Sequence, residues 1–108
     1  RAFYPDGTSG SRKPYPPKFL DMFGVYIIRS CKDGSLYTGY SSDVKKRFAE
    51  HNKGKVTSTC DKRPLEMLFC ELYKNKDDAL ERERFFKTGW GRNYIKKILR
   101  NTLKEKIK

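Results

Sequence analysis

Two tyrosines, Tyr26 and Tyr37, carry phenol groups that could bind a ligand or take part in catalysis. They lie in two runs, 23–30 and 36–40, that are rich in aromatic and β-branched residues. Asp33-Gly34 between these runs predicts a β-hairpin, because this dipeptide favours tight turns between strands. If the loop holds an even number of residues, both phenols lie on the same face of the hairpin.

The pairing of the two strands depends on the loop length. With Asp33 and Gly34 as the only loop residues, Ser30 lies opposite Tyr37 and Ile28 lies opposite Gly39. The missing side chain at the glycine would then leave a gap on the face that carries both phenols. Such a gap is able to hold a ligand, but tyrosine is also a common strand residue, and the pattern alone favours an ordinary strand.

A first helix is predicted between residues 43 and 54, with an N-cap at its start and a glycine at its end. At 100° per residue, Val44 and Phe48 define its buried stripe, and Arg47 and His51 border that stripe one turn apart. Each has an ordinary interpretation beside a functional one. The arginine stem can cover apolar surface, and a histidine at a helix end is favoured by the helix dipole.

A second helix is predicted over residues 75–87, and it contains a carboxylate in an unexpected place. Ala79 and Phe86 mark its inward face, and Glu83 projects into the same apolar stripe. Because burying an unpaired carboxylate is costly, we expect Glu83 to have a partner. The pattern leaves two partners open, an ion pair with Arg47 or a bound metal ion.

The remaining elements complete a small α+β domain. Residues 65–73 predict a third, largely buried strand, Trp90–Arg92 predict a turn, and residues 93–108 predict a basic amphipathic helix. The order β-β-α-β-α-α predicts a small antiparallel three-stranded sheet flanked by helices.

The chain has 108 residues and a formal net charge of +12, which favours nucleic acid as a partner. From residue 87 onward, the sequence contains eight basic residues and one acidic residue. No long apolar run or lipidation signal predicts contact with a membrane. The candidate contacts to nucleic acid are Lys45, Lys46, Lys87, Arg92 and Lys96.

Residues 1–21 hold four of the five prolines and predict a disordered or extended arm, either appended to the protein or translated upstream of Met22. The folded domain is expected over residues 22–108. The three cysteines form no C-x-x-C pair, which indicates reduced thiols, and no secretory signal is recognisable. Both observations predict a cytoplasmic protein.

Several of these motifs occur together in one known family. The tripeptides Gly24-Val25-Tyr26 and Tyr37-Thr38-Gly39, the arginine helix around Arg47 with its Glu50-His51-Asn52 run, and the helix bearing Glu83 resemble the GIY-YIG nuclease superfamily. The chain is most similar to small stand-alone bacterial members, which are related to the N-terminal nuclease domain of an excinuclease. The resemblance extends to about residue 99. Each tripeptide differs from the family pattern at one position, where Val25 or Thr38 replaces isoleucine; both replacements are also β-branched.

The resemblance implies a metal-dependent endonuclease that hydrolyses DNA, with a role in DNA repair or recombination. It implies one Mg²⁺ (or Mn²⁺) ion held by Glu83, with Arg47 on the scissile phosphate. Tyr26 is the general base on this resemblance, whereas His51 has the better intrinsic pKa, near 6.5. Tyr37 would orient water or phosphate.

The sequence leaves the substrate and its targeting open. RNA is an alternative substrate, and a protein partner is one means of targeting. The runner-up function is a non-catalytic nucleic-acid-binding module that uses the same basic surface.

Overall fold

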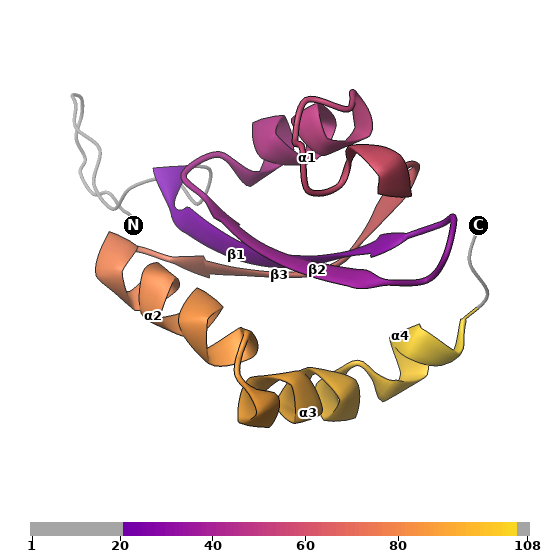
Figure 1. Ribbon diagram of the computed structural model, residues 1–108. Coiled ribbons are helices and arrows are strands. Elements are labelled where there is room, and N and C mark those ends of the chain that lie inside the picture. The colour runs from indigo at the N-terminus through magenta and orange to yellow at the C-terminus, as the bar shows by residue number, and fades with distance from the viewer. Residues whose placement is uncertain (1–20, 106–108) are drawn as a thin grey trace, which may run out of the picture.

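The computed structural model describes residues 21–105, in which a three-stranded antiparallel sheet separates two layers of helices (Figure 1). The predicted fold class and element order are confirmed. The predicted N-terminal arm, except for Asp21, lies outside the described residues. The elements are β1 (Phe23–Ser30), β2 (Leu36–Ser41), α1 (Val44–Asn52), the short 3₁₀-helix η2 (Cys60–Lys62), β3 (Leu65–Tyr73), α2 (Lys76–Phe86), α3 (Gly89–Ile98) and α4 (Arg100–Lys104).

The strand order is β2-β1-β3, so β1 is central and pairs antiparallel with both neighbours. Helix α1 covers one face of this sheet, and α2 and α3 cover the other (Figure 1). Strand β3 was predicted to be largely buried, but it is an edge strand and only Leu65 in it is buried. A strand with one free edge and one partner cannot be enclosed as β1 is.

The predicted hairpin is present, but its pairing is shifted by two residues. Tyr26 lies opposite Gly39, and Ile28 lies opposite Tyr37. The reason is the loop length: the Ser30 N–H donates to the Ser35 carbonyl at 2.8 Å, which leaves four residues between them. The shift is even, so both phenols still lie on one face of the sheet, as predicted.

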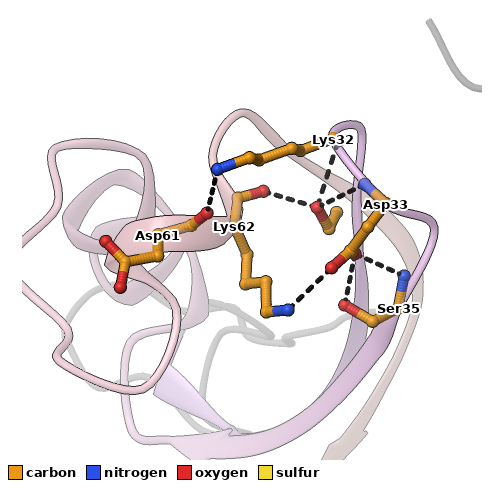
Figure 2. Close-up of polar contacts among 6 residues, drawn as sticks. Lys32, Asp33, Ser35, Asp61 and Lys62 are labelled. Atoms are coloured by element: carbon orange, nitrogen blue, oxygen red, sulfur yellow. Dashed lines mark hydrogen bonds and ion pairs between the residues drawn. The ribbon is translucent and has the colours of Figure 1, made fainter.

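The loop of this hairpin is fastened to the segment that precedes β3 (Figure 2). The Lys62 ammonium pairs with the Asp33 carboxylate, 2.6 Å apart, and the Lys32 ammonium donates to the Asp61 carbonyl at 3.3 Å. Beneath them, the buried Ser30 hydroxyl donates to the Lys62 carbonyl at 2.7 Å. These contacts fix the tip of the hairpin relative to η2.

Two apolar clusters lie on the two faces of the sheet. Between the sheet and α2–α3, the buried side chains are Val25, Ile27, Ala79, Phe86, Ile95 and Leu99. Between the sheet and α1, they are Tyr26, Ile28 and Leu65, with Val44 and Phe48 packed against them. Alternate residues of β1 therefore serve both clusters, as expected for a central strand.

The C-terminal third departs from the predicted elements. Trp90–Arg92 belong to α3 and do not form a turn, and the predicted helix over residues 93–108 breaks at Leu99 before α4. The Thr88 hydroxyl caps α3 by accepting from the Gly91 N–H at 3.0 Å. A side chain at Gly91 would collide with the backbone at the end of α2, so glycine permits the close approach of the two helices. No helix within residues 21–105 is long and apolar enough to cross a bilayer.

Candidate active site

The ring of Tyr26 extends from β1 over the neighbouring edge strand β2. It occupies the space directly above Gly39, where an added Cβ would collide with the phenol oxygen. The predicted open gap at Gly39 is therefore wrong, because the tyrosine fills it. Glycine at this position allows the phenol group to reach toward the exposed edge of the sheet.

Tyr26 is joined to His51 by a buried hydrogen bond. The phenol oxygen lies 2.9 Å from His51 Nε2, and His51 Nδ1 lies 2.7 Å from the Thr59 hydroxyl oxygen. The exposed fractions are 1% for Tyr26 and 0% for His51. His51 does lie in the last turn of α1, as predicted, but it is buried and both of its ring nitrogens are engaged inside the protein.

The Tyr37 ring also packs against this histidine. Its centroid lies 5.3 Å from the imidazole centroid at an edge-on angle of 63°. The Tyr26 ring contacts the same imidazole at 5.7 Å. The two tyrosines of the hairpin and the histidine of α1 therefore form one aromatic cluster between sheet and helix.

The surroundings set the protonation states of this cluster. Burial and the nearby Arg47 charge hold the pKa of His51 below its usual value of 6.5, so the imidazole is neutral at pH 7. Burial raises the pKa of Tyr26 to about 12, and the neighbouring Tyr37 adds to the effect. The Arg47 charge opposes this rise only in part. A protonated phenol therefore meets a neutral imidazole at neutral pH.

Arg47 lies at the solvent boundary of the cluster. Its side chain is 41% exposed and pairs with Glu50 one turn further along α1, at 3.3 Å. Its positive charge nevertheless acts on both Tyr26 and His51. The structural ion pair with Glu83 that the sequence left open is not formed in the described structure.

Glu83 approaches the cluster from the other layer of helices. Its neighbour Arg82 is anchored on β3 by the Glu71 carboxylate, at 2.9 and 3.2 Å, and packs against the Phe86 ring. This anchor fixes the rotation of α2, and Glu83 follows about 100° around the helix. The Glu83 carboxylate lies near enough to Tyr26 to raise the pKa of the phenol.

The Glu83 carboxylate is one-fifth exposed, and Lys87 lies 3.2 Å from one of its oxygens. The Lys87 side chain is 54% exposed and its ammonium group ends a flexible chain. A cation that binds the carboxylate more tightly can therefore displace the ammonium group from Glu83. Among residues 21–105, no three His, Cys, Asp or Glu side chains converge. A single carboxylate fits Mg²⁺ or Mn²⁺, which take their remaining ligands from water and phosphate, better than it fits a structural zinc site.

Three of the predicted nucleic-acid contacts line one pocket between β2 and the α2–α3 layer. Lys87, Arg92 and Lys96 border this pocket of about 270 Å³ together with Phe86 and Tyr37. Lys45 and Lys46 are exposed on the outer side of α1 and do not line this pocket.

Thr59 is the member of the cluster that sequence reasoning missed. It lies in a polar loop of Thr, Ser, Lys and Arg, where nothing distinguishes it from its neighbours. Only the folding of residues 55–64 back against α1 brings its hydroxyl group to His51.

Comparisons with known proteins identify the family of this chain. Residues 22–97 match the model of the GIY-YIG catalytic domain. A UPF0213 protein of Staphylococcus epidermidis is 44% identical over 80 residues, which cover 73% of this chain and 96% of the relative. Similar proteins of Staphylococcus saprophyticus (43%) and Staphylococcus aureus (44%) match over 70 residues, or 64% of this chain and 84% of each relative. The chain therefore belongs to the GIY-YIG family, whose catalytic domain is a nuclease domain.

Proposed function

We propose that this protein is a divalent-metal-dependent endonuclease that hydrolyses phosphodiester bonds of DNA, in the cytoplasm and in the service of repair or recombination. The observation that carries the proposal is the buried Tyr26–His51 hydrogen bond above Gly39 of β2. Arg47 and Glu83 support it, because both lie near enough for their charges to act on the Tyr26 phenol. The basic residues beside β2 and the charge of +12 support a polyanionic substrate.

In this proposal, Tyr26 and His51 share the task of activating water. His51 Nε2 faces the phenol oxygen of Tyr26, so a proton reaches the imidazole through the phenol group. The phenol hydroxyl donates to His51 Nε2, and the phenol oxygen accepts a proton from the attacking water as its own proton passes to the imidazole. The histidine supplies the basicity that a phenol with a pKa of about 12 lacks.

The relay requires one particular tautomer of His51. Nδ1 must carry the hydrogen and donate it to the Thr59 hydroxyl, so that Nε2 is free to accept. The Thr59 hydroxyl can accept this bond because its own hydrogen points toward the Val56 carbonyl, 3.5 Å away. Thr59 thus acts as a positioning residue for the base.

Arg47 and Glu83 would neutralise the charge of the phosphate group. The Arg47 guanidinium can donate two parallel hydrogen bonds to the scissile phosphate and stabilise the charge that develops there. Glu83 would hold the single divalent ion, Mg²⁺ or Mn²⁺, which supplies charge neutralisation at the phosphate and the leaving oxygen. Tyr37, beside His51, would orient water or phosphate.

A panel of substrates tests the proposal. Duplex, nicked, flap and single-stranded DNA, with matched RNA, are incubated with and without Mg²⁺ or Mn²⁺, and Glu83→Gln is the control. We expect metal-dependent cleavage of DNA by the wild type alone. Salt-sensitive binding without cleavage by any metal would favour the alternative, a non-catalytic nucleic-acid-binding module. Activity only after a binding protein is added would identify a targeting partner.

A further inference from the structure

Trp90 is the most exposed large apolar side chain of the described residues, with 84% of its surface accessible. It is also the only tryptophan of the chain. It lies in the first turn of α3. Helix α3 directly follows α2, the helix that carries Glu83 (Figure 1). An aromatic ring exposed to this extent contributes little to the packing of the fold.

The tryptophan begins an apolar stripe along α3. Tyr94 and Ile98 follow at intervals of four residues, so all three lie on one side of the helix, and each of the latter two is 39% exposed. Tyr94 is held in place by stacking on Phe86 at 6.4 Å. The stripe therefore carries two aromatic rings one helical turn apart, and this packing fixes the ring of Tyr94.

The charges around the stripe favour one kind of partner. Residues 84–104 contain seven lysines and arginines and no acidic residue. Lys97 lies seven positions after Trp90, which places it beside the stripe on the same helix. An exposed aromatic ring bordered by cations is the combination with which proteins bind single-stranded nucleic acid, because bases stack on the ring while phosphates lie on the cations.

We propose that Trp90 is a stacking platform for an unpaired base, so that the protein engages nucleic acid with a single-stranded segment beside the bond it cleaves. This inference rests on the proposed nuclease function and specifies its substrate class. A base inside a duplex cannot present its face to Trp90, whereas a flap, a gap or a single strand can.

Fluorescence excited at the red edge of the absorption band, where tyrosine does not absorb, reports on this residue alone, because the chain has no other tryptophan. The test titrates Glu83→Gln protein, without added metal, with a single-stranded thymine oligonucleotide, an abasic oligonucleotide of equal length and a blunt duplex. Binding is followed in parallel by anisotropy of a labelled oligonucleotide. This design separates the platform from cleavage, since no catalysis takes place.

We expect the thymine oligonucleotide to quench the fluorescence and the abasic strand and the duplex to leave it unchanged. Trp90→Ala should weaken single-strand binding by about tenfold, and Trp90→Phe should restore part of the loss. Ile98→Ala is the matched control, because it removes apolar surface from the same stripe without removing a ring that a base can stack on. It should leave the affinity within about twofold.

Two results would overturn the inference. One is equal binding of single strands by the wild type and Trp90→Ala with no change in fluorescence. The other is loss of self-association in sedimentation experiments for both Trp90→Ala and Ile98→Ala, which would assign the stripe to a second copy of the chain. Quenching by single strands without any metal-dependent cleavage by the wild type would contradict the nuclease function and leave the platform in place.

Discussion

The phenol oxygen of Tyr26 lies 2.9 Å from His51 Nε2, in a space closed to solvent between the sheet and α1. The two residues are 25 positions apart in sequence. Gly39 brings them together, because its missing side chain lets the tyrosine ring cross the edge strand. The proposed base is therefore a pair of side chains and not one residue.

A pair of this kind predicts non-additive losses of activity. Tyr26→Phe and His51→Gln should each lower the single-turnover cleavage rate by about 10²–10⁴-fold, since each removes a step of the same proton transfer. The double variant should be little slower than either single variant. Rates are measured at saturating metal and protein. Losses that multiply in the double variant would show that the two residues act independently.

The buried neutral histidine also predicts a pH dependence of stability. The pKa of His51 is below 6.5 in the folded protein, so the unfolded chain takes up the proton first as the pH falls. The free energy of unfolding should therefore decrease as the pH falls below about 6.5. Urea unfolding between about pH 7.5 and 5 measures this slope. His51→Gln should abolish it in that range, because the chain has no other histidine.

Carboxylates affect the free energy of unfolding in a lower pH range than His51 does. Burial alone would raise the pKa of Glu71, but hydrogen bonds from Arg82 and Tyr73 outweigh it and hold this pKa below 4.5. The contribution of Glu71 to stability is therefore lost only at lower pH. A slope that persists between about pH 6.5 and 5 in His51→Gln would contradict the assignment to the histidine.

A third prediction concerns the glycine beneath the tyrosine ring. Gly39→Ala should lower the free energy of unfolding by about 1–3 kcal/mol, because the new methyl group collides with the Tyr26 hydroxyl. It should also slow cleavage, since the phenol must move away from His51. Gly89→Ala is the control: its Cβ would meet nothing within 4 Å, and it lies inside α3. This control should be neutral or stabilise by up to about 1 kcal/mol. Equal effects of both substitutions would refute the steric explanation.

We expect the Lys87 ammonium group to compete with the metal ion for the Glu83 carboxylate. This ammonium group lies 3.2 Å from Glu83, so Lys87→Met should free the carboxylate and lower the half-saturating Mg²⁺ concentration. The lysine is more than half exposed and its charge is screened by solvent, which limits the change to about fivefold. Metal titrations at saturating DNA separate this effect from weaker DNA binding. Lys45→Met, on the outer side of α1, removes the same charge and should leave the metal titration unchanged.

Local patterns of the sequence were sufficient to predict the three strands and the first two helices of this fold. The N-cap at Asp43 and the strand at Leu65–Tyr73 are where the sequence places them, because capping and alternation act over a few residues. The helix start at Gly89 was missed. Glycine and tryptophan in succession are typical of a turn. Glycine is needed at position 91 because the backbone of α2 lies against it, a contact that exists only in the folded chain.

The site was predicted less completely than the fold. Periodicity identified Glu83 and Arg47 as unusual, but it suggested an ion pair between them that the described structure does not form. The reason is that α1 and α2 lie on opposite faces of the sheet, which no helical pattern reveals (Figure 1). Burial of His51 and its bond to Thr59 likewise depend on how the loop after α1 folds back on the helix.

Replacement of Glu83 by glutamine is the most direct test of the proposed metal site. The change keeps the shape of the side chain but removes the charge that would hold the divalent ion. We predict that metal-dependent cleavage falls by about a thousandfold or more, whereas DNA affinity measured without metal stays within a few-fold of the wild type. Cleavage at the wild-type rate by Glu83→Gln, with an unchanged Mg²⁺ requirement, would contradict the assignment of Glu83 as the metal ligand.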